Sequence, residues 1–247
     1  MKSKFYKFLN LTSLCLSFIV SAQIWPTDTI KVNINSGNPR FPFPQFQEYT
    51  AGKSLAKYNA EGVTHADMEK AMREGYQIMM HRALYTGKIH GGVKYIVFNY
   101  GSVPHNYGTF VSEGDGYALL AAAYLGDKST FDGLWMWVHD NRLSGVKKYY
   151  NCADLRPTNT YGKNLPCWMC EETDPAYSTN VGSASDGDFD IAMALLMATK
   201  QWGDNMGVED ACGNPISYKT EALTMIKALV DTVYYTQGPM GNMAGVK

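Results

Sequence analysis

The stretch from Ala184 to Trp202 constrains this chain more than any other. It opens with Ala-Ser-Asp-Gly-Asp-Phe-Asp, and apolar residues then recur every three or four positions, at Ile191, Leu195, Ala198 and Trp202. This spacing predicts a helix with one buried face. Asp186, Asp188 and Asp190 therefore fall at the helix N-terminus, where free N–H groups and the helix dipole favour ionised carboxylates. One aspartate suffices to cap a helix, so three indicate a further role.

Apolar spacing elsewhere predicts a mainly α-helical domain. The segment 64–67, Thr-His-Ala-Asp, resembles a capping box, and an apolar stripe follows it at Met68, Met72, Tyr76 and Met79. Further helices are expected at 112–125, 129–138 and 217–235. Residues 92–100 favour a short strand, and the Pro- and Asn-rich run 30–46 favours an extended surface arm.

The N-terminus resembles an export signal. Three lysines within the first seven residues precede an apolar stretch at about 9–20, and Val20-Ser21-Ala22 fits cleavage after Ala22. We therefore expect a signal peptide over 1–22, an extended arm over 23–63, and a secreted or periplasmic protein. No segment is long and apolar enough for a membrane span. The net charge of −1 gives no reason to expect a nucleic-acid partner, and we expect a monomer.

The cysteines allow three interpretations. Cys15 lies within the expected signal, which leaves four others: Cys152, Cys167, Cys170 and Cys212. In an oxidising compartment an even number favours disulfides, with three possible pairings. The Cys-Trp-Met-Cys spacing at 167–170 alternatively fits half of a zinc site, although no second close pair accompanies it. Free thiols are the remaining alternative.

A second acidic segment leads to a family resemblance. Val-Ser-Glu-Gly-Asp-Gly-Tyr at 111–117 places Glu113 between a serine and a glycine at a predicted helix start. Thr-Phe-Asp-Gly-Leu-Trp-Met-Trp follows at 130–137. Together with the motif at 184–188, these segments resemble glycoside hydrolase family 8 over about residues 64–235. That family carries Ser-Glu-Gly, Phe-Asp-x-Leu-Trp and Ala-Ser/Thr-Asp-Gly/Ala-Asp segments in this order.

The resemblance implies an (α/α)6 barrel. It also implies endo-acting, inverting hydrolysis of a β-1,4-linked polysaccharide, cellulose or another β-glucan first, with xylan and chitosan as alternatives. Glu113 matches the proton donor, and Asp186 matches the essential active-site aspartate. Trp168 lies where the family has a tryptophan that stacks on a glucosyl ring, with ordinary packing as the alternative. Further candidates for substrate binding are Asp115, Tyr117 and Asp188, with support of a neighbouring site residue or a helix cap as the alternatives for Asp188. Asp190 is interpreted as a helix cap, and no cofactor or metal is expected.

Physical chemistry refines the role of Asp186. Inverting hydrolysis needs a protonated carboxyl at the leaving oxygen and a carboxylate that activates water, about 6.5–9.5 Å away. It needs no covalent nucleophile. We therefore interpret Asp186 as a residue that holds the sugar at the −1 subsite and helps to keep Glu113 protonated by like-charge repulsion.

The sequence also departs from the family pattern. Asp115 and Leu119 stand where the family commonly has Gln and Met, and a cysteine-bearing expansion lies between Glu113 and Asp186. Twelve helices need more than the roughly 200 residues after the arm, so we expect 64–247 to be a catalytic domain truncated at its C-terminus. No motif identifies a general base among the remaining carboxylates: Glu209, Asp210, Glu221 and Asp231. The alternatives are a non-catalytic carbohydrate-binding remnant and a truncated product that does not fold.

Overall fold

The structure is a computed structural model that describes residues 28–34, 60–98, 110–141, 164–166, 168–170, 183–210 and 213–231. Most of this part of the chain is helical: α2 (His65–Met80), α3 (Ser112–Leu125), α4 (Lys128–Asn141), α5 (Ser185–Trp202) and α6 (Tyr218–Leu229). The described strands are short: β1 (Asp28–Thr29), β2 (Ala83–His90), β3 (Val93–Phe98), β4 (Phe110–Val111), β5 (Met169–Cys170), β6 (Asn205–Glu209) and β7 (Pro215–Ser217). The expectation of a mainly helical fold is confirmed.

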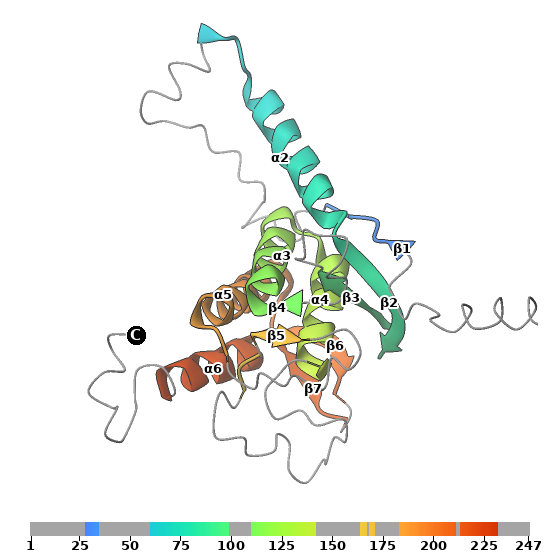
Figure 1. Cartoon of the computed structure of the whole chain (residues 1–247), viewed down its shortest axis with the longest axis vertical. Coiled ribbons are helices and arrows are strands. Elements are labelled where there is room, and N and C mark those ends of the chain that lie inside the picture. Colours follow the sequence, from blue (N-terminus) through green and yellow to red (C-terminus); the bar gives the residue numbers. More distant parts are fainter. Residues whose placement is uncertain are drawn as a thin grey trace, which may run out of the picture.

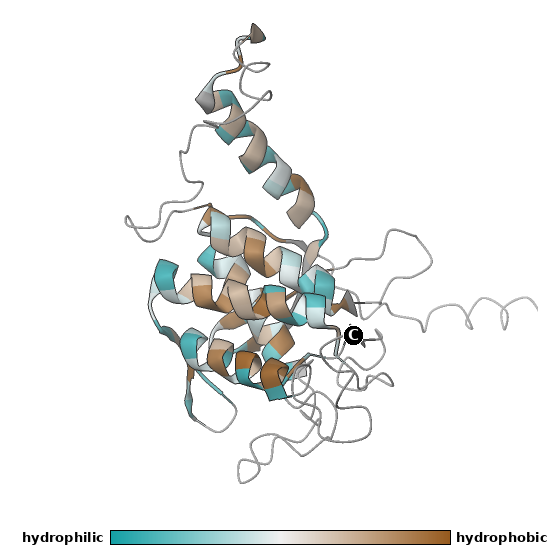
Figure 2. Ribbon diagram, turned by 90° about the vertical axis from the view of Figure 1, so that its left-hand side faces the viewer, coloured by the Kyte–Doolittle hydropathy of each residue, from teal (hydrophilic) through white to brown (hydrophobic). Residues whose placement is uncertain are grey.

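Four of these helices form one body, from which α2 projects (Figures 1 and 2). Within the body α5 packs against both α3 and α6, and α3 also contacts α4. The antiparallel sheet β1-β2-β3 lies against α4 through β3. Gly133 permits this close contact, because a Cβ there would lie 2.6 Å from the Ile96 side chain and 2.7 Å from the Lys94 carbonyl oxygen.

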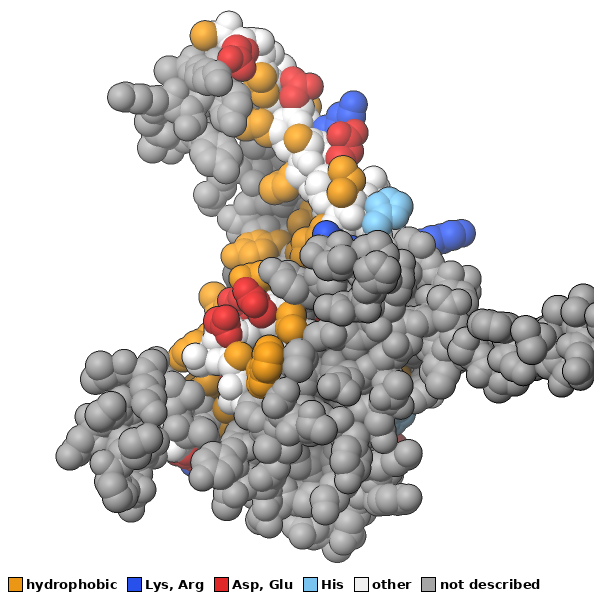
Figure 3. Space-filling view, in the orientation of Figure 1, with side chains coloured by type: hydrophobic (Ala, Val, Ile, Leu, Met, Phe, Trp, Pro, Cys, Tyr) orange, Lys and Arg blue, Asp and Glu red, His pale blue; other side chains and the backbone are white. Residues whose placement is uncertain are grey.

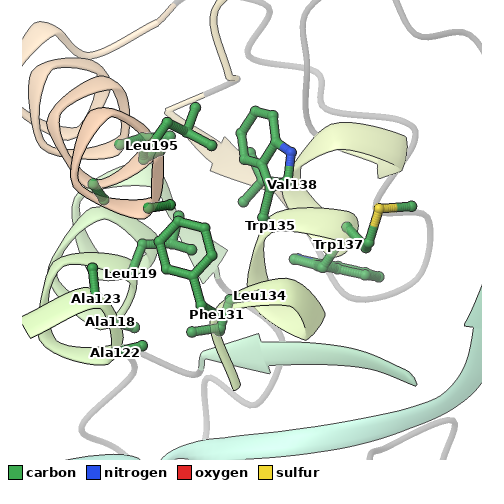
Figure 4. Close-up of a cluster of buried hydrophobic side chains, with 14 of the residues drawn as sticks. Ala118, Leu119, Ala122, Ala123, Phe131, Leu134, Trp135, Trp137, Val138 and Leu195 are labelled. Atoms are coloured by element: carbon green, nitrogen blue, oxygen red, sulfur yellow. The ribbon is translucent and has the colours of Figure 1, made fainter. Parts of the chain in front are cut away.

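The core centres on α4. Every residue from Thr130 to His139 is buried, and Trp135 is the largest of the fully buried side chains. Phe131 lies with Leu119 of α3 and Leu195 of α5 in one cluster (Figure 4). The Phe131 ring also meets Trp202 and Tyr218 edge-on, at centroid distances of 5.2 and 5.6 Å. Residues from four helices, α3 to α6, thus bury a common apolar surface, which is the main source of stability in such a body.

The predicted helix boundaries agree with the structure within a few residues, except that α6 ends at Leu229 and the last predicted residues, 232–235, lie outside the described residues. The capping box is present, because the Thr64 hydroxyl accepts from the Asp67 N–H and the Asp67 carboxylate accepts from the Thr64 N–H. The helix at 112–125 begins and ends as predicted, and Gly126, at φ 68°, ends it in a left-handed conformation that glycine adopts readily. The strand expected within 92–100 is β3. The strands β2, β6 and β7 were not predicted.

Asp127 connects three separate segments. Just ahead of α4, its carboxylate accepts hydrogen bonds from the Thr130 N–H and hydroxyl, at 3.2 and 2.7 Å. It also accepts from the Tyr76 hydroxyl of α2, at 3.0 Å, and from the Asn33 N–H of the N-terminal segment, at 3.0 Å. Burial, followed by the charge of Asp127, raises the pKa of Tyr76, so this phenol stays a neutral donor. One buried carboxylate therefore caps α4 and holds both α2 and the arm.

A second polar cluster joins the sheet to the C-terminal end of α4. The Asp140 carboxylate lies 2.6 Å from His90 Nδ1 and 2.7 Å from His139 Nδ1, and it accepts from the Tyr95 hydroxyl. Burial by itself would raise the pKa of Asp140. The hydrogen bonds and charge of His139, with the hydrogen bonds of Tyr95 and His90, outweigh it and hold the pKa below its usual value.

Several sequence expectations lie outside the described residues. These are the signal peptide at 1–22, most of the arm, and all cysteine side chains, since only the backbone of Cys170 is described, in β5. Export and cysteine pairing therefore stay predictions. Of the arm, residues 28–34 begin with β1, and Ile30 packs into the core.

Candidate active site

Two helices of the body begin with the same residue pattern, Ser-acid-Gly-Asp. It occupies Ser112–Asp115 at the start of α3 and Ser185–Asp188 at the start of α5. The N-cap positions are Val111 and Ala184, whose side chains provide no capping hydrogen bond. The negative charges that favour these helix starts therefore come from acids within the first turn.

Glycines bring the two helix starts into direct contact. A Cβ added at Gly187 would lie 2.6 Å from the Glu113 nitrogen, the Ser112 carbonyl carbon and the Ser112 Oγ. A Cβ at Gly116 would lie 2.7 Å from the Asp190 Cβ and 3.2 Å from the Gly187 oxygen. Gly187 of α5 meets Ser112 and Glu113, and three residues further along both helices Asp190 meets Gly116. The helices α3 and α5 therefore run in the same direction. Their positive dipole ends therefore converge at one place.

The five carboxylates at this place fall into two groups. Asp115 and Asp188 are fully buried, at 0% exposure. Asp186 is exposed, and Glu113 and Asp190 are half-buried. The second group therefore has access to solvent, and its red side chains lie among hydrophobic ones over α3 and α5 in Figure 3.

Hydrogen bonds orient the two acids that the motifs single out. The Tyr117 hydroxyl, one helical turn along α3, donates to Glu113 Oε1 at 3.0 Å. Asp186 Oδ1 accepts from the Gly187 N–H at 2.9 Å. The Tyr117 ring is 42% exposed, so it lines the open side of Glu113.

The three accessible carboxylates interact electrostatically. Burial raises the pKa of Asp190, and the negative charges of Asp186 and Glu113 raise it further. Asp190 lies four residues after Asp186, on the same face of α5. Its interpretation as a helix cap is wrong, because the N-cap residue is Ala184 and Asp190 lies a turn and a half inside the helix.

Three exposed aromatic side chains belong to the segments that carry these acids or pair with them. Trp168 is 39% exposed, and its carbonyl oxygen accepts from the Ser112 N–H at 2.9 Å. Pairing of Val111 with Met169 between β4 and β5 holds this segment against the start of α3. Tyr117 and Phe189 are exposed as well. An aromatic ring can stack on the apolar face of a sugar ring, and a carboxylate can hydrogen-bond to its hydroxyl groups.

The site residues predicted from sequence thus gather at one end of α3 and α5. Glu113, Asp186, Tyr117 and Trp168 lie on the accessible side, whereas Asp115 and Asp188 lie in the interior. Direct sugar contact by any of them stays a prediction. The sequence analysis did not group Asp190 with Glu113 and Asp186, although its i+4 spacing from Asp186 was visible in the sequence.

Three of the four later carboxylates have partners of their own. Glu221 lies 3.9 Å from His139 Nε2, Asp210 accepts from the Asn214 backbone at 2.9 Å, and Asp231 pairs with Lys227. Within the described ranges, no group of three or more His, Cys, Asp or Glu side chains is arranged to hold a metal ion. The helices in those same ranges include none that is long and apolar enough to cross a membrane.

Curated relatives match long parts of this chain. A Beta-glucanase of Niallia circulans is 29% identical over 196 residues, which are 77% of this chain and 39% of that protein. Endoglucanase 2 of Ruminiclostridium josui is 33% identical over 122 residues, which are 49% of this chain and 21% of that protein. The chain therefore spans about two fifths or less of the length of these relatives.

Solved structures share the fold at low sequence identity. The apo structure of Beta-1,3-1,4-glucanase from Paenibacillus sp. X4 has a TM-score of 0.52 and 24% identity, covering 81% of this chain and 44% of that one. A double mutant of Rex8A from Paenibacillus barcinonensis has a TM-score of 0.51 and 18% identity, covering 71% and 40%. The predicted fold class is confirmed: the described helices form part of an (α/α)6 barrel.

The family model agrees with both comparisons and with the geometry. It is described as Glycosyl hydrolases family 8 and matches residues 102–233, slightly more than half of the chain. The match contains α3 to α6, and with them both acidic helix starts. The chain belongs to glycosyl hydrolases family 8.

Proposed function

We propose that this chain supplies the proton donor and the −1 subsite aspartate of an endo-acting, inverting β-glycan hydrolase, with a β-1,4-linked glucan as substrate. The observation that carries the proposal is the contact between the first turns of α3 and α5, which juxtaposes Glu113 and Asp186 within the family-matched region. The names of the relatives, Beta-glucanase and Endoglucanase 2, support the substrate class.

The proposed chemistry divides between the two helices. Glu113, oriented by Tyr117, donates a proton to the glycosidic oxygen as the bond to the anomeric carbon breaks. Asp186, exposed beside it, accepts hydrogen bonds from the sugar at the −1 subsite and stabilises positive charge that develops on the ring. Water attacks from the opposite face, which inverts the configuration. The carboxylate that activates this water is not assigned to any described residue.

The test compares isosteric neutral variants with a matched control. Glu113→Gln and Asp186→Asn should each lower reducing-sugar release from soluble mixed-linkage β-glucan by about 100-fold or more, since a general acid contributes 10² to 10⁴. Asp204→Asn, an exposed aspartate beyond the other end of α5, should keep wild-type turnover. Near-normal turnover in either site variant contradicts the assignment, and proton NMR of the first product decides between inversion and retention.

The exposed rings favour a second candidate function, carbohydrate binding without hydrolysis. Trp168, Tyr117 and Phe189 offer stacking surfaces that need no general base. Calorimetry with cello-oligosaccharides separates the two functions. Binding without sugar release by the wild-type chain favours the binding function, and binding with release favours the hydrolase.

A further inference from the structure

Asp190 of α5 packs against α3 at Gly116, where α3 has no side chain. Its Cβ would lie 2.7 Å from a Cβ at Gly116, so the Asp190 side chain starts against the α3 backbone. Gly116 follows Glu113 by three residues, and Asp190 follows Asp186 by four. Positions three and four apart share a helix face, so the facing sides of α3 and α5 carry Glu113, Asp186 and Asp190 together.

The charged groups that act on Asp190 are both negative. They are Asp186 on its own helix and Glu113 on α3, and the neutral Tyr117 hydroxyl bonds to Glu113 rather than compensating Asp190. The other half-buried aspartates of the described residues have cationic or hydrogen-bonding partners, as Asp140 has His90 Nδ1 at 2.6 Å and His139 Nδ1 at 2.7 Å. Like charges held close together lower the stability of the folded protein, and such arrangements are typical of functional sites.

We propose that Asp190 is a positioning residue of this active site, which acts on the reaction through Glu113 and Asp186 by holding a third carboxyl group against them. The proposal rests on the proposed hydrolase function. Neighbouring carboxyl groups repel one another when ionised, so the protonation of one depends on the charge of the others. The raised pKa of Asp190 agrees with this coupling. Asp190 thereby adds a negative charge beside the proton donor.

The first test does not require activity. The side-chain carboxyl carbon of Asp190 is followed by 13C NMR during a pH titration, and its resonance is identified by its loss in Asp190→Asn. Its titration midpoint should fall by about 0.5 pH unit or more in Glu113→Gln and in Asp186→Asn, because each removes a neighbouring negative charge. Asp204→Asn should leave the midpoint unchanged, since that position lies about 20 Å away along α5. An Asp190 midpoint equal in wild type and in both site variants overturns the proposal.

The second test uses the pH dependence of hydrolysis. Asp190→Asn should move the alkaline limb of the kcat/KM profile to lower pH by about 0.5 unit or more, because two carboxyl groups lose their last proton more readily than three. In Asp190→Glu, which keeps a carboxyl group, the alkaline limb should lie closer to its wild-type position than in Asp190→Asn. A change in KM with an unmoved profile indicates direct sugar contact and overturns the positioning role. If the wild-type chain releases no sugar, the proposed function fails, while the NMR comparison still decides whether the three groups are coupled.

Discussion

The contact between α3 and α5 makes Gly187 the most sensitive small residue of the site. In Gly187→Ala the new Cβ would lie 2.6 Å from Ser112 Oγ and from backbone atoms of Ser112 and Glu113. Ordinary contact begins at 3.4 Å, so the two helix starts must separate by 3.4 − 2.6 = 0.8 Å. Because most of the opposing atoms are backbone, no change of rotamer relieves the clash. Such overpacking costs about 1–3 kcal/mol.

Gly75 provides the matched control for this substitution. It lies inside α2, and an added Cβ would meet nothing within 4 Å. Gly75→Ala should therefore stabilise the protein by about 0.5–1 kcal/mol through helix propensity alone. Both variants gain a similar propensity term, so the difference between them isolates the packing cost at Gly187.

Urea unfolding followed by far-UV circular dichroism measures both variants against wild type. Gly75→Ala should raise the free energy of unfolding, and Gly187→Ala should lie about 1–3 kcal/mol below Gly75→Ala at an unchanged m-value. Displacement of Glu113 by nearly 1 Å should also lower hydrolysis by up to about 100-fold. Equal stability of the two alanine variants would refute the close approach of α3 and α5.

Two polar clusters give further predictions. Asp127→Ala should cost about 2–4 kcal/mol, because it removes the cap of α4 and leaves the buried hydroxyls of Tyr76 and Thr130 without their acceptor. Asp67→Ala, which removes an exposed partner in a capping box, should cost about 1 kcal/mol or less in the same urea experiment. Asp140→Asn should lower stability at pH 7, since the folded state holds the pKa of Asp140 below its usual 3.8. That stabilisation is fully present above pH 3.8 and is lost as pH falls through the lowered pKa, so the gap between wild type and variant should narrow in acid. A gap that stays constant from pH 7 to pH 2 contradicts the assigned role.

Local sequence was sufficient for the helices that carry the site. The capping box at Thr64, the apolar recurrence from Ile191 to Ala198 and the glycine at 126 act within a few residues of themselves. Such features fix where a helix starts, which face is apolar and where it ends. For the same reason the two acidic motifs could be placed at helix N-termini from sequence alone.

The strands β2, β6 and β7 escaped prediction although β2 pairs with β3, and β6 with β7, across short turns. In β2, Gly87 and a register irregularity between Tyr85 and Ile89 interrupt the alternation typical of strands. The strand forms through pairing with β1, more than 50 residues earlier, and with β3. Pairing of this kind depends on tertiary context more than on the intrinsic preference of the segment.

The amino-acid sequence by itself determined the helices, the family resemblance and the two acids, Glu113 and Asp186, in two separate motifs. Tertiary structure alone decided which carboxylates are buried, as Asp115 and Asp188 are, and which remain accessible. It also brought Asp190 to Gly116, 74 residues away in the chain, and so placed it on the face of α5 that meets α3. The physical reason is that periodicity defines the faces of a helix, whereas only packing between helices determines which faces meet.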